Sequence, residues 1–259
     1  MTISPSVCAE REVGLRLLGG TAVDGRAARG VVPGGVKART LLAVLALEAG
    51  AAVSTERLLD HLWEVEPPRS AVKNLQLYVL RLRRCLDTAG AGLSRLLVRV
   101  GHGYRLDVPA EAVDALWASE LARRGAVAVR AGAWGEAAGL LGAALADWPV
   151  DGLVGLVPSR PALAAATALR ERRLAAVERL ATAKLALGAA AEAADLLVAQ
   201  AAAQPTREST HVLLMRALSA VGDRAGAIAA YHRLWRALRD DFGIEPGRAA
   251  RAEFDGVRA

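Results

Sequence analysis

Two neighbouring stretches of the sequence decide the fold, namely Asn74-Leu-Gln-Leu-Tyr-Val-Leu-Arg-Leu-Arg-Arg84 and Leu96-Leu-Val-Arg-Val-Gly-His-Gly-Tyr-Arg-Leu106. The first has apolar residues at helical spacing and belongs to a predicted helix over residues 69–86. The second has two short apolar runs around Gly101-His-Gly103, which is the pattern of a β-hairpin. A long helix followed by a basic hairpin is typical of a winged helix-turn-helix domain.

The predicted helix over residues 69–86 has two different faces. At about 100° per residue, its core side chains fall within an arc of about 60°; they are Leu75, Val79, Leu82 and Leu86. The other side carries the candidate DNA-reading residues Arg69, Lys73, Gln76, Leu77, Arg81 and Arg84, with Leu80 beside them. Arginine and lysine reach phosphates and guanine edges, and a glutamine amide suits adenine. We interpret Arg83, nearer the core edge, as a snorkelling or ion-paired side chain.

The hairpin supplies a second set of candidates, Arg99, His102 and Arg105, which lie around its glycines and are expected to hold phosphate. The charge distribution agrees with this interpretation. The net charge is +6, with 15 lysines and arginines against 10 acidic residues in residues 1–109 and 18 against 17 in the remainder. Concentrated positive charge indicates a phosphate-binding surface. The alternative is a solvated basic helix whose arginines only favour its dipole.

The residues before the helix fit the same domain. Short strands are expected within residues 14–23, a helix over residues 37–47, and a second helix over residues 55–63 with Ser54 as its N-cap. We therefore predict a flexible N-terminus over residues 1–12 and a winged-helix domain over residues 13–109.

The remaining residues, 110–259, predict an all-α domain of helical repeats. Gly132-Ala-Trp-Gly-Glu-Ala137 is echoed by Gly188-Ala-Ala-Ala-Glu-Ala193 and more loosely by Gly222-Asp-Arg-Ala-Gly-Ala227. The second and third copies have the spacing of tetratricopeptide repeats, whose stacked helix pairs form a concave surface. The alternative is an alanine-rich bundle with chance similarity. The predicted fold class is thus mainly α with a small β part, a winged helix followed by a tetratricopeptide-like domain.

Both halves also resemble one family. The runs Lys37-Ala-Arg-Thr-Leu-Leu-Ala43, Ser54-x-x-Arg-Leu-Leu-Asp-His-Leu-Trp63, Asn74 to Arg84 and Gly103-Tyr-Arg-Leu106 resemble the OmpR-type winged helix of the SARP family, the actinomycete antibiotic regulatory proteins. Pro205-Thr-Arg-Glu208 and Leu238-Arg-Asp-Asp-Phe-Gly-Ile-Glu-Pro246 resemble its bacterial transcriptional activator domain. The run Trp148-Pro-Val-Asp-Gly152 departs from the family pattern, as do Leu77 and Leu80, where small polar residues are expected.

The resemblance implies a transcriptional activator of secondary-metabolite genes. Such a protein binds direct repeats in promoters as a dimer on double-stranded DNA and recruits RNA polymerase, through its sigma factor. The rival interpretation is a protein-binding regulator that uses a vestigial winged helix and the repeats as interaction modules.

Catalytic chemistry is not expected. The run from Gly30 to Lys37 lacks the spacing and the serine or threonine of a phosphate loop, and the four histidines lack metal-ligand partners. We expect no enzymatic activity, no metal and no cofactor. Without a signal peptide, a long apolar run or a plausible disulfide between Cys8 and Cys85, a cytoplasmic location away from membranes is expected.

Overall fold

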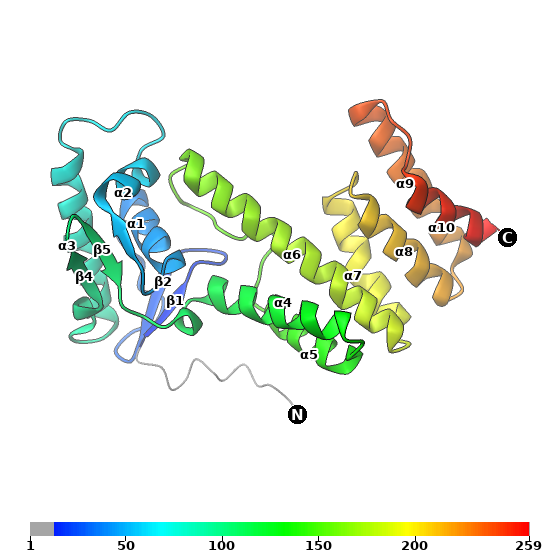
Figure 1. The fold of residues 1–259 in the computed structure, drawn as a ribbon, viewed down its shortest axis with the longest axis horizontal. Helices are drawn as coiled ribbons and strands as arrows, with labels where there is room; N and C mark the ends of the chain where they lie inside the picture. The colour runs from blue at the N-terminus through cyan, green and yellow to red at the C-terminus, as the bar shows by residue number, and fades with distance from the viewer. Residues whose placement is uncertain (1–12, 259) are drawn as a thin grey trace. The chain divides into compact units, whose positions relative to one another are not determined.

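The computed structural model describes residues 13–258 (Figure 1), so the predicted flexible N-terminus and Cys8 lie outside the described residues. Two compact units make up the chain. The winged-helix unit contains the residues up to Glu120 and Ala146–Arg172, and the helical unit contains Leu121–Leu145 and Arg173–Ala259. The boundary expected after residue 109 is a boundary between sequence domains, and it remains a prediction.

The winged-helix unit combines two small sheets with a helical core. Its elements are β1 (Val13–Arg16), β2 (Ala22–Gly25), α1 (Val36–Leu47), β3 (Ala52–Ser54), α2 (Thr55–Leu62), α3 (Ala71–Ala89), the short 3-10 helix η2 (Leu93–Leu96), β4 (Leu97–Val100), β5 (Gly103–Leu106) and a second 3-10 turn, η3 (Ala110–Ala112). Strands β1 and β2 pair antiparallel, and the second sheet has the order β3-β5-β4. The predicted winged helix-turn-helix is confirmed.

The boundaries of α3 differ from the predicted range of 69–86. The helix begins at Ala71, whose N–H donates to the carbonyl of Pro68 in the turn before it (2.8 Å), so Arg69 precedes the helix. The two prolines at 67 and 68 favour an extended backbone ahead of that turn. At the other end the helix runs on to Ala89, whose carbonyl accepts the N–H groups of Ala27 and Ala28 (2.9 and 3.1 Å).

Strand β3 is an element that the sequence did not predict. It has only three residues, too few for an alternating pattern, and its edge pairing with β5 exists only in the folded chain. Its last residue, Ser54, is also the predicted N-cap of α2. The Ser54 hydroxyl accepts the N–H of Arg57 at 3.3 Å, which confirms the cap.

A segment from the second half of the sequence packs into the core of the winged-helix unit. We call residues 146–159 the clasp. Its Trp148 side chain is 2% exposed. The N–H of Val157 donates to the hydroxyl of Thr40 on α1 (2.9 Å), and the carbonyl of Gly152 accepts the N–H of Gly19 (2.8 Å). The clasp therefore hydrogen-bonds to the buried Thr40 of this unit and buries its own tryptophan.

The helical unit is built from helix pairs, as the sequence repeats predict. The helices of this part of the chain are α4 (Asp114–Arg130), α5 (Trp134–Leu145), α6 (Arg160–Ala186), α7 (Ala190–Ala203), α8 (Glu208–Ala220), α9 (Arg224–Phe242) and α10 (Arg248–Arg258); α4 and α6 begin within the residues of the other unit (Figure 1). All three repeat turns share one backbone hydrogen bond that the sequence alone does not reveal. Ala133, Ala189 and Asp223 each donate to the carbonyl five residues earlier (3.0, 2.9 and 2.9 Å).

Two residue types make these turns possible. The glycines at 132, 188 and 222 all have φ between 71° and 84°, the left-handed region that closes a helix end. The alanines five residues later, Ala137, Ala193 and Ala227, are fully buried. Small side chains there let the paired helices approach closely, so the repeat interpretation of the sequence is confirmed in the structure.

A substitution at Thr40 tests the clasp. Thr40→Val keeps the shape of this fully buried side chain but leaves the N–H of Val157 without its acceptor. The free energy of unfolding of the winged-helix unit should fall by about 1–3 kcal/mol, measured by urea titration. Thr88→Val is the matched control, because that exposed hydroxyl donates only to the carbonyl of Arg84 in its own helix. Equal losses in the two variants would contradict a structural role for the clasp.

Candidate nucleic-acid interface

Helix α3 buries one face and exposes the other, as the rotation of the sequence predicts. Its core residues Leu75, Val79, Leu82 and Leu86 are all buried. The side chains of Lys73, Gln76, Leu77, Leu80, Arg81 and Arg84 are exposed, Leu77 at 44% and Leu80 at 45%. Arg69 is also exposed, but in the turn before the helix. The exposed face between Val72 and Arg84 contains no acidic residue.

The wing residues point in different directions. In the β4–β5 pairing, Arg99 faces Tyr104 and Val98 faces Arg105. Partners across a strand pair share a face and successive residues alternate, so Arg99 and Arg105 lie on opposite faces of the hairpin. Arg99 and His102 are exposed, whereas Arg105 is half-buried and forms an ion pair with Asp107 (3.0 Å). The structure thus places Arg99, but not Arg105, on the same side of the hairpin as the buried Tyr104.

A basic hollow lies between the end of α3 and the wing. It has a volume of about 620 Å³, and its charged lining residues are Arg83, Arg95 and Arg99. Arg83 donates to the carbonyl of Leu97 on β4 (3.2 Å), which fixes its guanidinium at the helix–hairpin junction. The interpretation of Arg83 as an edge residue agrees with this, but its place beside Arg99 was not predicted. Only the pairing of β4 with β5 reveals it.

A cluster of two cations and two aromatic rings connects α1 to α3. The Lys37 ammonium of α1 lies 3.7 Å from the centre of the Trp63 ring, and that ring contacts Tyr78 of α3 at 6.4 Å. Arg81 in turn lies 5.9 Å from the Tyr78 ring. Burial lowers the pKa of Lys37, although the ring face favours its charged form. The cluster holds the N-terminal end of α1 against α3 and orients Arg81.

The exposed groups of this surface are of the kind that bind a ligand. Among residues 13–258, no three His, Cys, Asp or Glu side chains gather in a way that would hold a metal ion. The thiol of Cys85 is buried, which raises its pKa to about 11 and leaves it protonated at neutral pH. No helix within the described residues is long and apolar enough to cross a membrane. What the surface offers is arginine, lysine and amide donors beside two leucines.

Comparison with known proteins agrees with this arrangement. Residues 30–106 match the model of the C-terminal domain of transcriptional regulatory proteins, and residues 113–258 match the bacterial transcriptional activator domain. The chain is 33% identical to the transcriptional regulator RedD of Streptomyces coelicolor, covering 92% of this chain and 68% of RedD. It is also 33% identical to the regulatory protein DnrI of Streptomyces peucetius, covering 83% and 81%.

A solved structure extends the similarity to three dimensions. Mycobacterium tuberculosis EmbR, in complex with a low-affinity phosphopeptide, superposes with a TM-score of 0.86 at 30% identity, over 96% of this chain and 65% of that one. The fold and the exposed helix define a winged-helix transcriptional regulator with a helical activator domain. The chain belongs to the SARP family.

Proposed function

We propose that this regulator binds double-stranded DNA sequence-specifically, with the exposed face of α3 in the major groove and the wing against the backbone. The observation that supports it best is the composition of that face. Lys73, Arg81 and Arg84 share it with Gln76 and no acidic residue, while the opposite face anchors the helix in the core. A rigid helix of this kind presents donors to phosphates and base edges without reordering.

The wing and the basic hollow would complete the contact with the backbone. Arg83, Arg95 and Arg99 line one hollow, and the exposed His102 lies in the turn of the same hairpin. Such contacts fix the register of the helix on the duplex and carry no sequence information themselves. In this assignment, base reading belongs to α3 and phosphate binding to the wing.

Activation is the second part of the proposal. The family supports binding to promoter direct repeats of secondary-metabolite genes as a dimer, with recruitment of RNA polymerase through its sigma factor. The protein would act in the cytoplasm as a binding protein, with no catalytic activity and no cofactor. The rival function is a protein adaptor, which the exposure of Leu77 and Leu80 favours.

A gel-shift series across salt concentrations separates the two functions. Replacing Lys73 and Arg84 with alanine should weaken DNA binding and reduce the slope of log K against log salt by about 0.9 for each phosphate that the protein no longer neutralises. Arg124→Ala, which removes the same kind of charge from the helical unit, is the control and should change neither value. A wild-type protein whose DNA binding shows no salt slope would support the adaptor function instead.

The two wing arginines should differ. Arg99→Ala should weaken binding to specific and random DNA alike, because this exposed side chain lies beside the basic hollow. Arg105→Ala should change affinity little, since Arg105 is paired with Asp107 on the other face. Fluorescence anisotropy on both DNAs measures this. A larger loss for Arg105→Ala than for Arg99→Ala would show that the opposite face of the hairpin meets DNA.

Leu77 should contribute to sequence preference through thymine methyl groups. Leu77→Ser should cost roughly 1 kcal/mol of binding free energy on the natural site. Binding to random DNA and the melting temperature should stay unchanged, because Leu77 is already exposed. The decisive comparison uses a second site whose facing T·A pairs are changed to C·G. If the swap weakens wild type and variant equally, Leu77 does not touch the base.

A further inference from the structure

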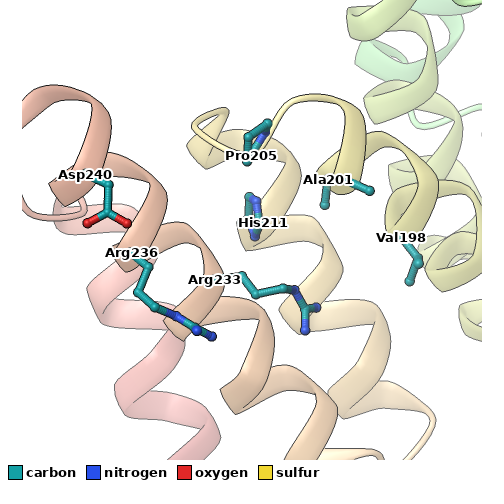
Figure 2. A pocket seen from close by; sticks show the side chains of 8 residues that line it. Val198, Ala201, Pro205, His211, Arg233, Arg236 and Asp240 are labelled. Carbon is teal, nitrogen blue, oxygen red and sulfur yellow. The ribbon is translucent and has the colours of Figure 1, made fainter.

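The helical unit contains a hollow that the DNA-binding proposal does not use. It lies among α7, α8 and α9 and has a volume of about 700 Å³, within the range typical of small-molecule sites. Its residues come from all three helices and from the turn between α7 and α8 (Figure 2): Val198, Ala201, Ala202, Pro205, His211, Arg233, Arg236 and Asp240.

The base of the hollow holds a buried histidine with one unsatisfied nitrogen. His211 is 1% exposed, and its Nδ1 lies 3.1 Å from the carbonyl oxygen of Ala230. A carbonyl only accepts, so Nδ1 carries a proton. Burial lowers the pKa of His211, the carbonyls of Ala230 and Pro205 act in the opposite direction, and the Arg233 guanidinium lowers it again. The net shift is downward, so the ring is neutral at pH 7. Nε2 is then a hydrogen-bond acceptor.

No protein group supplies a donor to this nitrogen. Nε2 has no hydrogen-bond partner among the described residues. The backbone group that lies nearby is the carbonyl of Pro205, which cannot donate to a lone pair. A buried polar atom without a partner is costly, so an occupant that brings a hydroxyl or an N–H into the hollow gains by satisfying it.

The rim of the hollow favours a negative charge. Arg233 and Arg236 lie on α9 beside a single acidic residue, Asp240 (Figure 2). Neither guanidinium forms an ion pair within residues 13–258; Arg236 donates only to the carbonyl of His232 in its own helix (3.3 Å). Val198, which is 51% exposed, provides an apolar wall with the two alanines and Pro205.

We propose that this hollow is a binding site for a small organic acid that carries a hydroxyl or N–H group. The carboxylate pairs with Arg233 and Arg236, the apolar body lies against Val198 and Pro205, and the donor reaches Nε2 of His211. An acidic peptide could also pair with the two arginines, but a hollow of about 700 Å³ fits a small molecule better than an extended chain.

Three matched probes test the site on the full chain by saturation-transfer NMR. They are para-hydroxyphenylacetate, phenylacetate, which lacks the donor, and para-hydroxyphenylacetamide, which lacks the charge. The first should bind best, with each of the others weaker by roughly tenfold, the usual effect of losing a charged or buried hydrogen bond. No transfer to any probe at millimolar concentration, or equal binding of all three, overturns the proposal.

Variants then locate the binding. Replacing Arg233 and Arg236 with alanine should weaken para-hydroxyphenylacetate by roughly tenfold or more, while Arg248→Ala, an exposed arginine on α10, should have no effect. His211→Phe should abolish the preference for the hydroxylated probe. If this substitution in the core unfolds the protein, the arginine variants still test the site, because the side chains of Arg233 and Arg236 are exposed. Binding that survives the double arginine variant places the acid elsewhere and overturns the site.

Discussion

The burial of one face of α3 is the interaction on which the winged-helix unit depends. Leu75, Val79, Leu82 and Leu86 anchor the helix, and α1, α2, β2 and the 3-10 helix η2 all contact it. Because a helix turns by about 100° per residue, fixing these four side chains also fixes the direction of every other one. The outward position of Lys73, Gln76 and Arg84 is therefore a consequence of core packing. The core packing and the proposed DNA contact therefore use different faces of one helix.

The two faces of α3 also show which features the sequence could predict. Apolar spacing identifies the buried face of α3, and thus the exposed candidates, because both follow from local helix geometry. The repeat turns could also be predicted from the sequence, since a left-handed turn at Gly188 and a close helix contact at Ala193 each require a particular residue. In each case a single residue or a regular spacing carries the information.

Other features depend on pairings between distant residues. The opposite directions of Arg99 and Arg105 follow from the register of β4 and β5, and the basic hollow follows from Arg83 reaching Leu97. Strand β3 exists only because β5 offers it an edge. The unsatisfied Nε2 of His211 likewise requires knowing that Ala230 occupies the other ring nitrogen. A sequence contains these residues but not their neighbours, so no periodicity identifies them.

The clasp shows why domains defined by sequence and by packing diverge here. Val157 follows α5 in the chain, yet its N–H donates to the buried hydroxyl of Thr40 on α1, and Trp148 of the same segment is buried. Asp114 makes a second connection of this kind, because its carboxylate accepts the N–H groups of Leu17 and Leu18 (2.9 and 3.1 Å) beyond β1. Burial raises the pKa of Asp114 to about 6, against the effect of those N–H donors. The winged-helix unit is therefore completed by residues that the sequence assigns to the activator domain, and a fragment ending before Asp114 would leave buried N–H groups and apolar side chains of that unit uncovered.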